Sequence, residues 1–161
     1  MTVTLPGLMP VKNMIEDLLG RSVEVTPGDP LKADDLKTSL VALYTDDRKQ
    51  LVSVFALDLP MAAYCGAALG LMPAGAAEDA VDEKSLSPAL LENVSELCNI
   101  FAGLLNKEGS PHVKLYSVIP PGADIPNDAH AYVLALGRRL DVNVSIKGYG
   151  GGRLAITLTD Q

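Results

Sequence analysis

The chain has 161 residues, 48% of them hydrophobic, which predicts one folded domain over 1–161 rather than a disordered chain. Its 13 basic and 20 acidic residues give a net charge of -7, and no basic cluster exceeds the pair Arg138-Arg139, so a nucleic-acid partner is not expected. No apolar run approaches the length of a membrane span, and the first residues lack a signal-peptide pattern. We therefore predict a cytoplasmic protein with no membrane partner.

Hydrophobic periodicity and turn residues divide the chain into helices and strands. Gly20 ends a first helix, and Ser87-Pro88 has the N-cap and N1 pattern of a helix start. In chain order we predict a helix over 8–20, a strand over 22–25, a hairpin of 36–44 and 51–57, a small-residue helix over 61–71, an acidic linker or helix start over 76–86, a long helix over 88–107, a strand over 113–119, an ambiguous helix or strand over 128–140, and a terminal hairpin of 142–146 and 154–158.

Several residues that often carry chemistry are better explained here by structure. Cys65 and Cys98 lie in apolar helical stretches and are expected to be buried, reduced thiols. The segment Gly148–Gly152 lacks the Lys-Ser/Thr of a phosphate-binding loop and is interpreted as a hairpin turn. His112 and His130 have no carboxylate at ligand spacing on a shared helix, so we expect no metal or cofactor to be bound by this chain.

One face of the long helix carries polar residues that helices do not favour. At about 100° per residue, one narrow stripe faces away from the predicted core. Asn and Gly each cost a helix some stability, so their presence on this stripe needs a reason beyond solvation. The residues of the stripe are Glu92, Glu96, Asn99, Gly103 and Asn106, and those of the apolar face are Leu90, Val94, Leu97, Phe101 and Leu104.

A carboxamide and a carboxylate on an exposed helix can assist phosphoryl chemistry. The amide of Asn99 can hold a water for in-line attack on a phosphoryl group, and the carboxylate of Glu96 can pair with a Lys beside the phosphate. Neither side chain is a nucleophile. The stripe is therefore expected to complete the active centre of another protein, with Gly103 leaving room for that partner.

The segment 88–103, with Glu96-Leu-Cys-Asn99-Ile-Phe-Ala-Gly103, resembles the signature helix of the CheC/CheX/FliY family, phosphatases of the chemotaxis response regulator CheY. The opening 8–20 and the Pro27-Gly-Asp-Pro30 turn also look like the start of CheX-type chains. Asn13-Met-Ile-Glu16 reverses the Glu-x-x-Asn order of the second CheC site, which favours the CheX-like branch. Glu92 replaces the Asp or Ser that family members often have, and Pro120 or Pro121 matches a downstream Pro.

The resemblance implies an α+β fold, with a mainly antiparallel sheet packed against two or three helices. It also implies that Glu96 binds a Lys of a phosphorylated CheY-like receiver, while Asn99 orients the attacking water. Glu92, Gly103 and Asn106 would contact that partner, and Mg²⁺ would be held by the receiver's own acidic cluster. Known relatives can be homodimers in which the sheet extends between subunits.

Two alternatives stay open at this point. The first is a non-catalytic adaptor that binds a receiver or a motility or signalling protein through the same helix. The second is a dimerisation module in which the stripe from Glu92 to Asn106 lies at a subunit interface.

Overall fold

The computed structural model describes residues 3–159, which form one six-stranded antiparallel sheet in the order β1-β5-β6-β3-β2-β4. The described helices comprise six α-helices and one 3-10 helix. The strands are β1 (Val23–Pro27), β2 (Leu40–Thr45), β3 (Leu51–Leu57), β4 (Lys114–Ile119), β5 (Arg139–Ile146) and β6 (Gly150–Leu158). The helices are α1 (Leu8–Leu19), α2 (Ala33–Leu36), α3 (Leu59–Leu69), α4 (Ala74–Glu83), α5 (Pro88–Phe101), the 3-10 helix η1 (Ala102–Leu104) and α6 (Asn127–Leu134).

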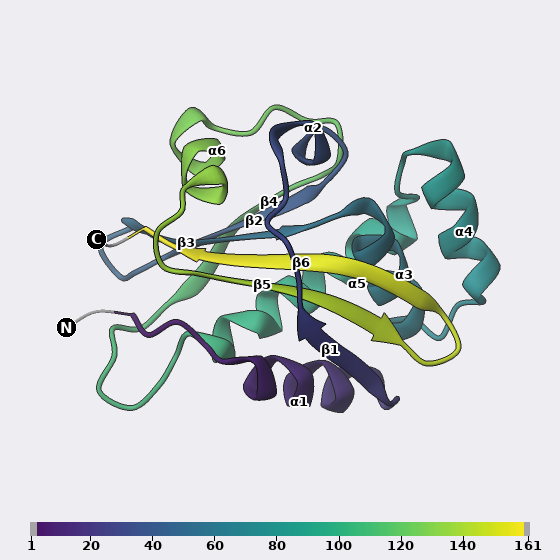
Figure 1. The fold of residues 1–161 in the computed structure, drawn as a ribbon, viewed down its shortest axis with the longest axis horizontal. Coiled ribbons are helices and arrows are strands. Elements are labelled where there is room, and N and C mark those ends of the chain that lie inside the picture. The colour runs from purple at the N-terminus through teal and green to yellow at the C-terminus, as the bar shows by residue number, and fades with distance from the viewer. Residues whose placement is uncertain (1–2, 160–161) are drawn as a thin grey trace.

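Helices cover both faces of the sheet (Figure 1). Alternate side chains of a strand point to opposite faces. Thus Leu40, Ala42 and Tyr44 of β2 join the core under α1, α3 and α5, whereas Val41 and Leu43 join the core under α2 and α6. Every residue of β2 is buried, because the strand is central enough to be covered on both sides.

The predicted fold class is confirmed, and the structure has more helices than the two or three expected. Residues 76–83 of the predicted acidic segment belong to α4, whose buried Ala77 and Ala80 pack on α3. The strand predicted from residue 36 begins at Leu40, because residues 33–36 form a short helix in which the Asp35 carboxylate accepts the N–H of Lys32 at 2.9 Å. The ambiguous segment 128–140 contains both alternatives, since α6 ends at Leu134 and β5 begins at Arg139.

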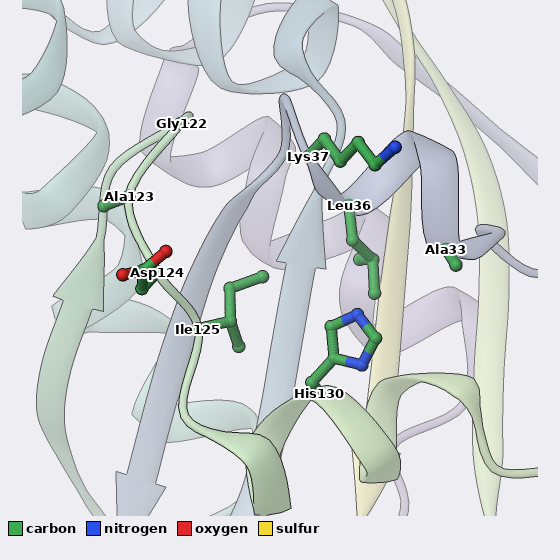
Figure 2. A pocket seen from close by; sticks show the side chains of 8 residues that line it. All are labelled: Ala33, Leu36, Lys37, Gly122, Ala123, Asp124, Ile125 and His130. Carbon is green, nitrogen blue, oxygen red and sulfur yellow. The ribbon is translucent and has the colours of Figure 1, made fainter.

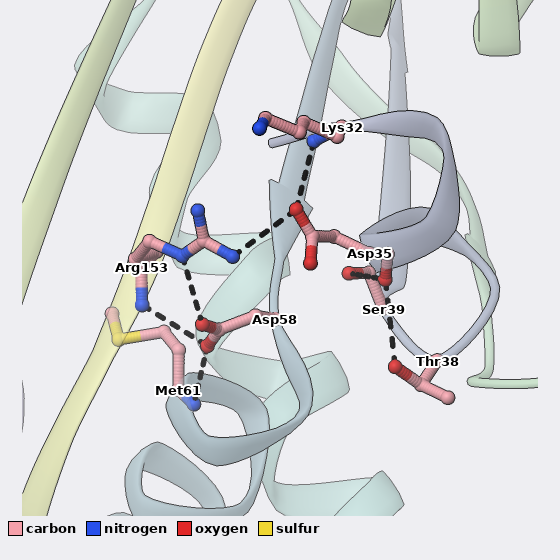
Figure 3. Close-up of polar contacts among 7 residues, drawn as sticks. All are labelled: Lys32, Asp35, Thr38, Ser39, Asp58, Met61 and Arg153. Atoms are coloured by element: carbon pink, nitrogen blue, oxygen red, sulfur yellow. Dashed lines mark hydrogen bonds and ion pairs between the residues drawn. The ribbon is translucent and has the colours of Figure 1, made fainter. Parts of the chain in front are cut away.

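An ion-pair network fixes α3 and α2 to β6 (Figure 3). The Asp58 carboxylate caps α3 by accepting the N–H of Met61 at 3.0 Å, and it also accepts the backbone N–H of Arg153 at 3.0 Å. The guanidinium of Arg153 lies 3.4 Å from Asp58 and 3.2 Å from Asp35. Gly152 lets Met61 approach the strand, because a Cβ there would clash with the Met61 backbone. The start of α3 therefore lies directly on the sheet, where it supports α5.

Candidate functional site

The helix that carries the predicted stripe begins where the sequence indicates. The Ser87 hydroxyl accepts the N–H of Leu90 at 3.2 Å, and Pro88 occupies the first turn, where no N–H is needed. The α-helix ends at Phe101 and continues as η1 to Leu104, slightly short of the predicted end at 107. The predicted apolar face is buried in full. The stripe is thereby presented to solvent along α5.

Glu96 and Asn99 lie on the exposed face, one turn apart. Within residues 3–159 neither side chain makes a hydrogen bond or an ion pair, and the same holds for Glu92. Solvent and any approaching molecule are the partners left to them. Asn99 thus lowers the helix propensity of α5 without a compensating contact inside the fold.

Asn106 differs from the other polar residues of the stripe, because its carboxamide is used by the fold. It donates to the Val113 carbonyl at 2.7 Å and accepts the Val113 N–H at 2.7 Å. Its amide also donates to the carbonyl of Ala102 at 3.1 Å. These bonds fix the segment between η1 and β4. Asn106 therefore stabilises the fold and is not needed at this position to contact a partner.

Gly103 is exposed but has a neighbour within the chain. A Cβ built on Gly103 would lie 3.3 Å from the terminal methyl of Met14 on α1. That methyl is the end of a flexible side chain and can move. The structure therefore places Gly103 at the seam between α1 and the end of α5, with its other side open to solvent.

A buried tyrosine that sequence reasoning missed holds the end of α5. The Tyr44 hydroxyl donates to the Cys98 carbonyl at 2.6 Å. Its ring lies 4.5 Å from that of Phe55, which in turn lies 6.0 Å from that of Phe101. A tyrosine within the aliphatic run of β2 was the available sequence signal, since a buried Tyr hydroxyl needs a partner.

The two cysteines are free and buried, as predicted. Burial raises the pKa of the Cys98 thiol to about 12 and raises that of Cys65 as well. Both thiols are therefore protonated near neutral pH and unsuited to nucleophilic chemistry.

The first helix does not repeat the site of α5. Glu16 accepts the N–H of Val23 at 3.0 Å and pairs with Lys12 at 3.3 Å. The Val23 N–H, followed by Lys12, lowers the pKa of this carboxyl. Because Glu16 is engaged in joining α1 to β1, the Asn13 to Glu16 segment has no free carboxylate comparable to Glu96.

A cavity of about 300 Å³ lies between α2, α6 and the segment before α6 (Figure 2). Its lining includes the side chains of Lys37, Asp124 and His130, over the apolar Leu36 and Ile125. None of the stripe residues lines it. It belongs to the side of the sheet that α6 covers, whereas α5 packs on the other side.

Two further observations concern ligands and membranes. Among residues 3–159, no three His, Cys, Asp or Glu side chains are grouped so that they could hold a metal ion. None of the helices in the same range is both long enough and apolar enough to cross a membrane.

The fold is shared with solved structures of FliM and FliY. FliM in a FliM–SpeE complex from H. pylori aligns with a TM-score of 0.64 at 10% identity, over 94% of this chain and 80% of that one. FliY from Thermotoga maritima aligns with a TM-score of 0.56 at 15% identity, over 90% and 80%. CheX from a CheX–CheY complex of Borrelia burgdorferi reaches 0.47 at 16% identity over 92% of each chain, a score too low to carry an argument.

These likenesses define the fold. No protein-family model and no curated protein sequence matches the chain. The chain has the fold of the CheC/CheX/FliY family, as its sequence predicted.

Proposed function

We propose that this chain is a phosphatase that hydrolyses the aspartyl phosphate of a CheY-like receiver domain. The observation that carries the proposal is the pair Glu96 and Asn99, exposed one turn apart on α5 with neither side chain bonded within residues 3–159. The signature-helix resemblance of this pair and the shared FliY fold support the proposal.

The proposed reaction needs positioning more than it needs new chemistry. The Asn99 carboxamide can accept a hydrogen bond from a water and align its oxygen with the phosphorus. The water oxygen bonds to the phosphorus as the P–O bond to the aspartate breaks, which releases a free carboxylate and inorganic phosphate, and the proton lost by the water goes to the phosphate or to solvent. Mg²⁺ held by the receiver would supply charge neutralisation, and the Glu96 carboxylate would pair with a receiver Lys. The chain contributes a water-orienting amide and a docking carboxylate.

The test is the decay of aspartyl phosphate on purified receiver domains from the same genome. Wild-type protein should accelerate the decay, and Asn99→Ala should abolish the acceleration while receiver binding persists. Glu96→Ala should weaken binding with little change in folding, because the side chain makes no bond in the fold. Asn13→Ala is the matched control, since Asn13 is an exposed asparagine on another amphipathic helix. Undiminished acceleration by Asn99→Ala would exclude the mechanism.

A non-catalytic adaptor is the second candidate, favoured by the alignment with FliM from the FliM–SpeE complex. An adaptor would use the α5 surface to bind a receiver or a motility protein without hydrolysis. Titration with phosphorylated and unphosphorylated receiver separates the two functions. An adaptor gives binding that Glu96→Lys weakens, together with a phosphate half-life that never changes.

A further inference from the structure

Strand β2 is irregular at Tyr44 on both of its sides. Against β3, Tyr44 pairs with Ser53 and Thr45 pairs with Leu51, so that Val52 is skipped. Against β4, the skipped residue is Tyr116. The extra residues, Val52 and Tyr116, lie on the two partner strands, and β-bulges occur often beside functional sites. Two irregularities at one residue single out Tyr44 among the residues of β2.

The side chain of Tyr44 lies on the same face of β2 as Leu40 and Ala42 and reaches α5 at the residue before Asn99. Tyr44 has no exposed surface, and its hydroxyl donates to the Cys98 carbonyl at 2.6 Å. Burial raises the pKa of Tyr44, so the hydroxyl keeps its proton and remains a donor over the working pH range. Titration of the hydroxyl therefore does not interrupt the contact in that range.

The Cys98 carbonyl and the Asn99 N–H belong to one rigid peptide plane. A bond to that carbonyl therefore constrains the Cα of Asn99 directly. The constraint falls where α5 tightens, because the Ala102 N–H donates to the Asn99 carbonyl and η1 follows. Carbonyls in the last turn of a helix otherwise lack intrahelical donors and allow fraying.

We propose that Tyr44 is a positioning residue, whose hydroxyl fixes the Cys98–Asn99 peptide and with it the direction in which the Asn99 carboxamide leaves the helix. This inference rests on the proposed function, in which Asn99 orients a water. A reaction accelerated by positioning is sensitive to displacements of about 1 Å, which can cost roughly a hundredfold in rate. Tyr44 acts through Asn99 and does not itself touch the receiver.

The test uses Tyr44→Phe, which removes the hydroxyl and keeps the ring beside Phe55. The matched control is Thr157→Val, which removes a buried hydroxyl bond of 3.0 Å to Val54 within the sheet, away from α5. Single-turnover dephosphorylation is measured against receiver concentration. For Tyr44→Phe we expect kcat to fall by about tenfold to a hundredfold with KM within about twofold. Thr157→Val should retain both values.

Amide hydrogen exchange provides a readout that does not depend on turnover. The amides of Ala102 and Leu105 bond to Asn99 and Ala102, so both should exchange faster in Tyr44→Phe than in Thr157→Val. A wild-type kcat for Tyr44→Phe, or an equal loss in Thr157→Val, would overturn the inference. Should the wild-type protein be inactive on every receiver, the phosphatase fails. Amide exchange then tests the inference by itself. Faster exchange at Ala102 and Leu105 in Tyr44→Phe would support it, and unchanged exchange would overturn it.

Discussion

Asn106 and Val113 are joined by two reciprocal hydrogen bonds of 2.7 Å, in which the carboxamide of one residue pairs with the backbone of the other. The carboxamide replaces the strand partner that Val113 would have in a sheet. It closes the loop that joins η1 to β4, and Val113 itself is buried. The α5 stripe therefore ends at a residue whose role is structural.

Asn106→Ala should lower the free energy of unfolding by about 1–3 kcal/mol, because both polar groups of Val113 lose their partner. Urea denaturation measures the change. Asn13→Ala, at an exposed asparagine on α1, should change the stability by less than about 0.5 kcal/mol. An Asn106→Ala protein as stable as wild type would mean that water replaces the carboxamide without cost.

The contact between α3 and α5 requires a glycine at 66. A Cβ there would lie 2.8 Å from the Leu90 carbonyl oxygen, which is backbone and cannot rotate away. Gly66→Ala should therefore push the helices apart and destabilise the fold by about 1–3 kcal/mol. Gly75→Ala is the control, since no atom lies within 4 Å of a Cβ there and alanine favours the helix. Thermal unfolding of the two variants should shift in opposite directions.

Gly103 allows a test of the partner's approach that is separate from folding. Gly103→Leu should leave stability nearly unchanged, because within residues 3–159 the one atom close to a new Cβ belongs to the flexible end of Met14. The larger side chain should weaken receiver binding if the partner approaches over this position. Calorimetric titration measures the affinity. Ala89→Leu, an exposed position at the other end of α5, is the control. Equal affinities for both variants would place the partner elsewhere.

The bond from Val23 to Glu16 predicts a pH-dependent contribution to stability. The pKa of Glu16 is lowered from 4.5 in the folded chain, so its stabilisation is present above that value and is lost as the pH falls through the folded pKa. Relative to Glu16→Gln, the wild type should be more stable at pH 7 and no more stable at about pH 3. Urea midpoints at the two pH values measure the difference. A difference that is the same at both would show that the charge has no role.

Much of this architecture follows from local signals. The α5 start was predictable because Ser87 and Pro88 satisfy the first turn within the sequence itself. The terminal hairpin was predictable because two apolar runs flank a glycine-rich segment, and Gly148 in the turn has a φ of +85°. The predicted turn over 148–152 was too long, since Gly150, Gly151 and Gly152 begin β6 and pair with β5. The exposure of Glu96 and Asn99 followed from helical periodicity alone.

Other features depend on contacts between segments far apart in the chain. The acidic composition of α4 hid its helix, because only Ala77 and Ala80 face the core and alanine carries little hydrophobic signal. The structural role of Asn106 was not predicted, because its hydrogen-bond partner, Val113, lies seven residues further along the chain, after a turn. The hydrogen-bond partner of Tyr44 could not be predicted, because it is the Cys98 carbonyl on α5. No local sequence pattern indicates that this helix packs beside β2.

The strand order has a consequence for how the protein is made. Strand β6 lies between β5 and β3, and β1 pairs only with β5, so that Val23 pairs with Ile146. Because β6 follows every other strand along the chain, a nascent polypeptide without residues 150–158 holds two unjoined part-sheets. Each part-sheet presents an open apolar edge to the crowded cell. A chain that stops before Gly150 should therefore aggregate more readily than one that includes β6.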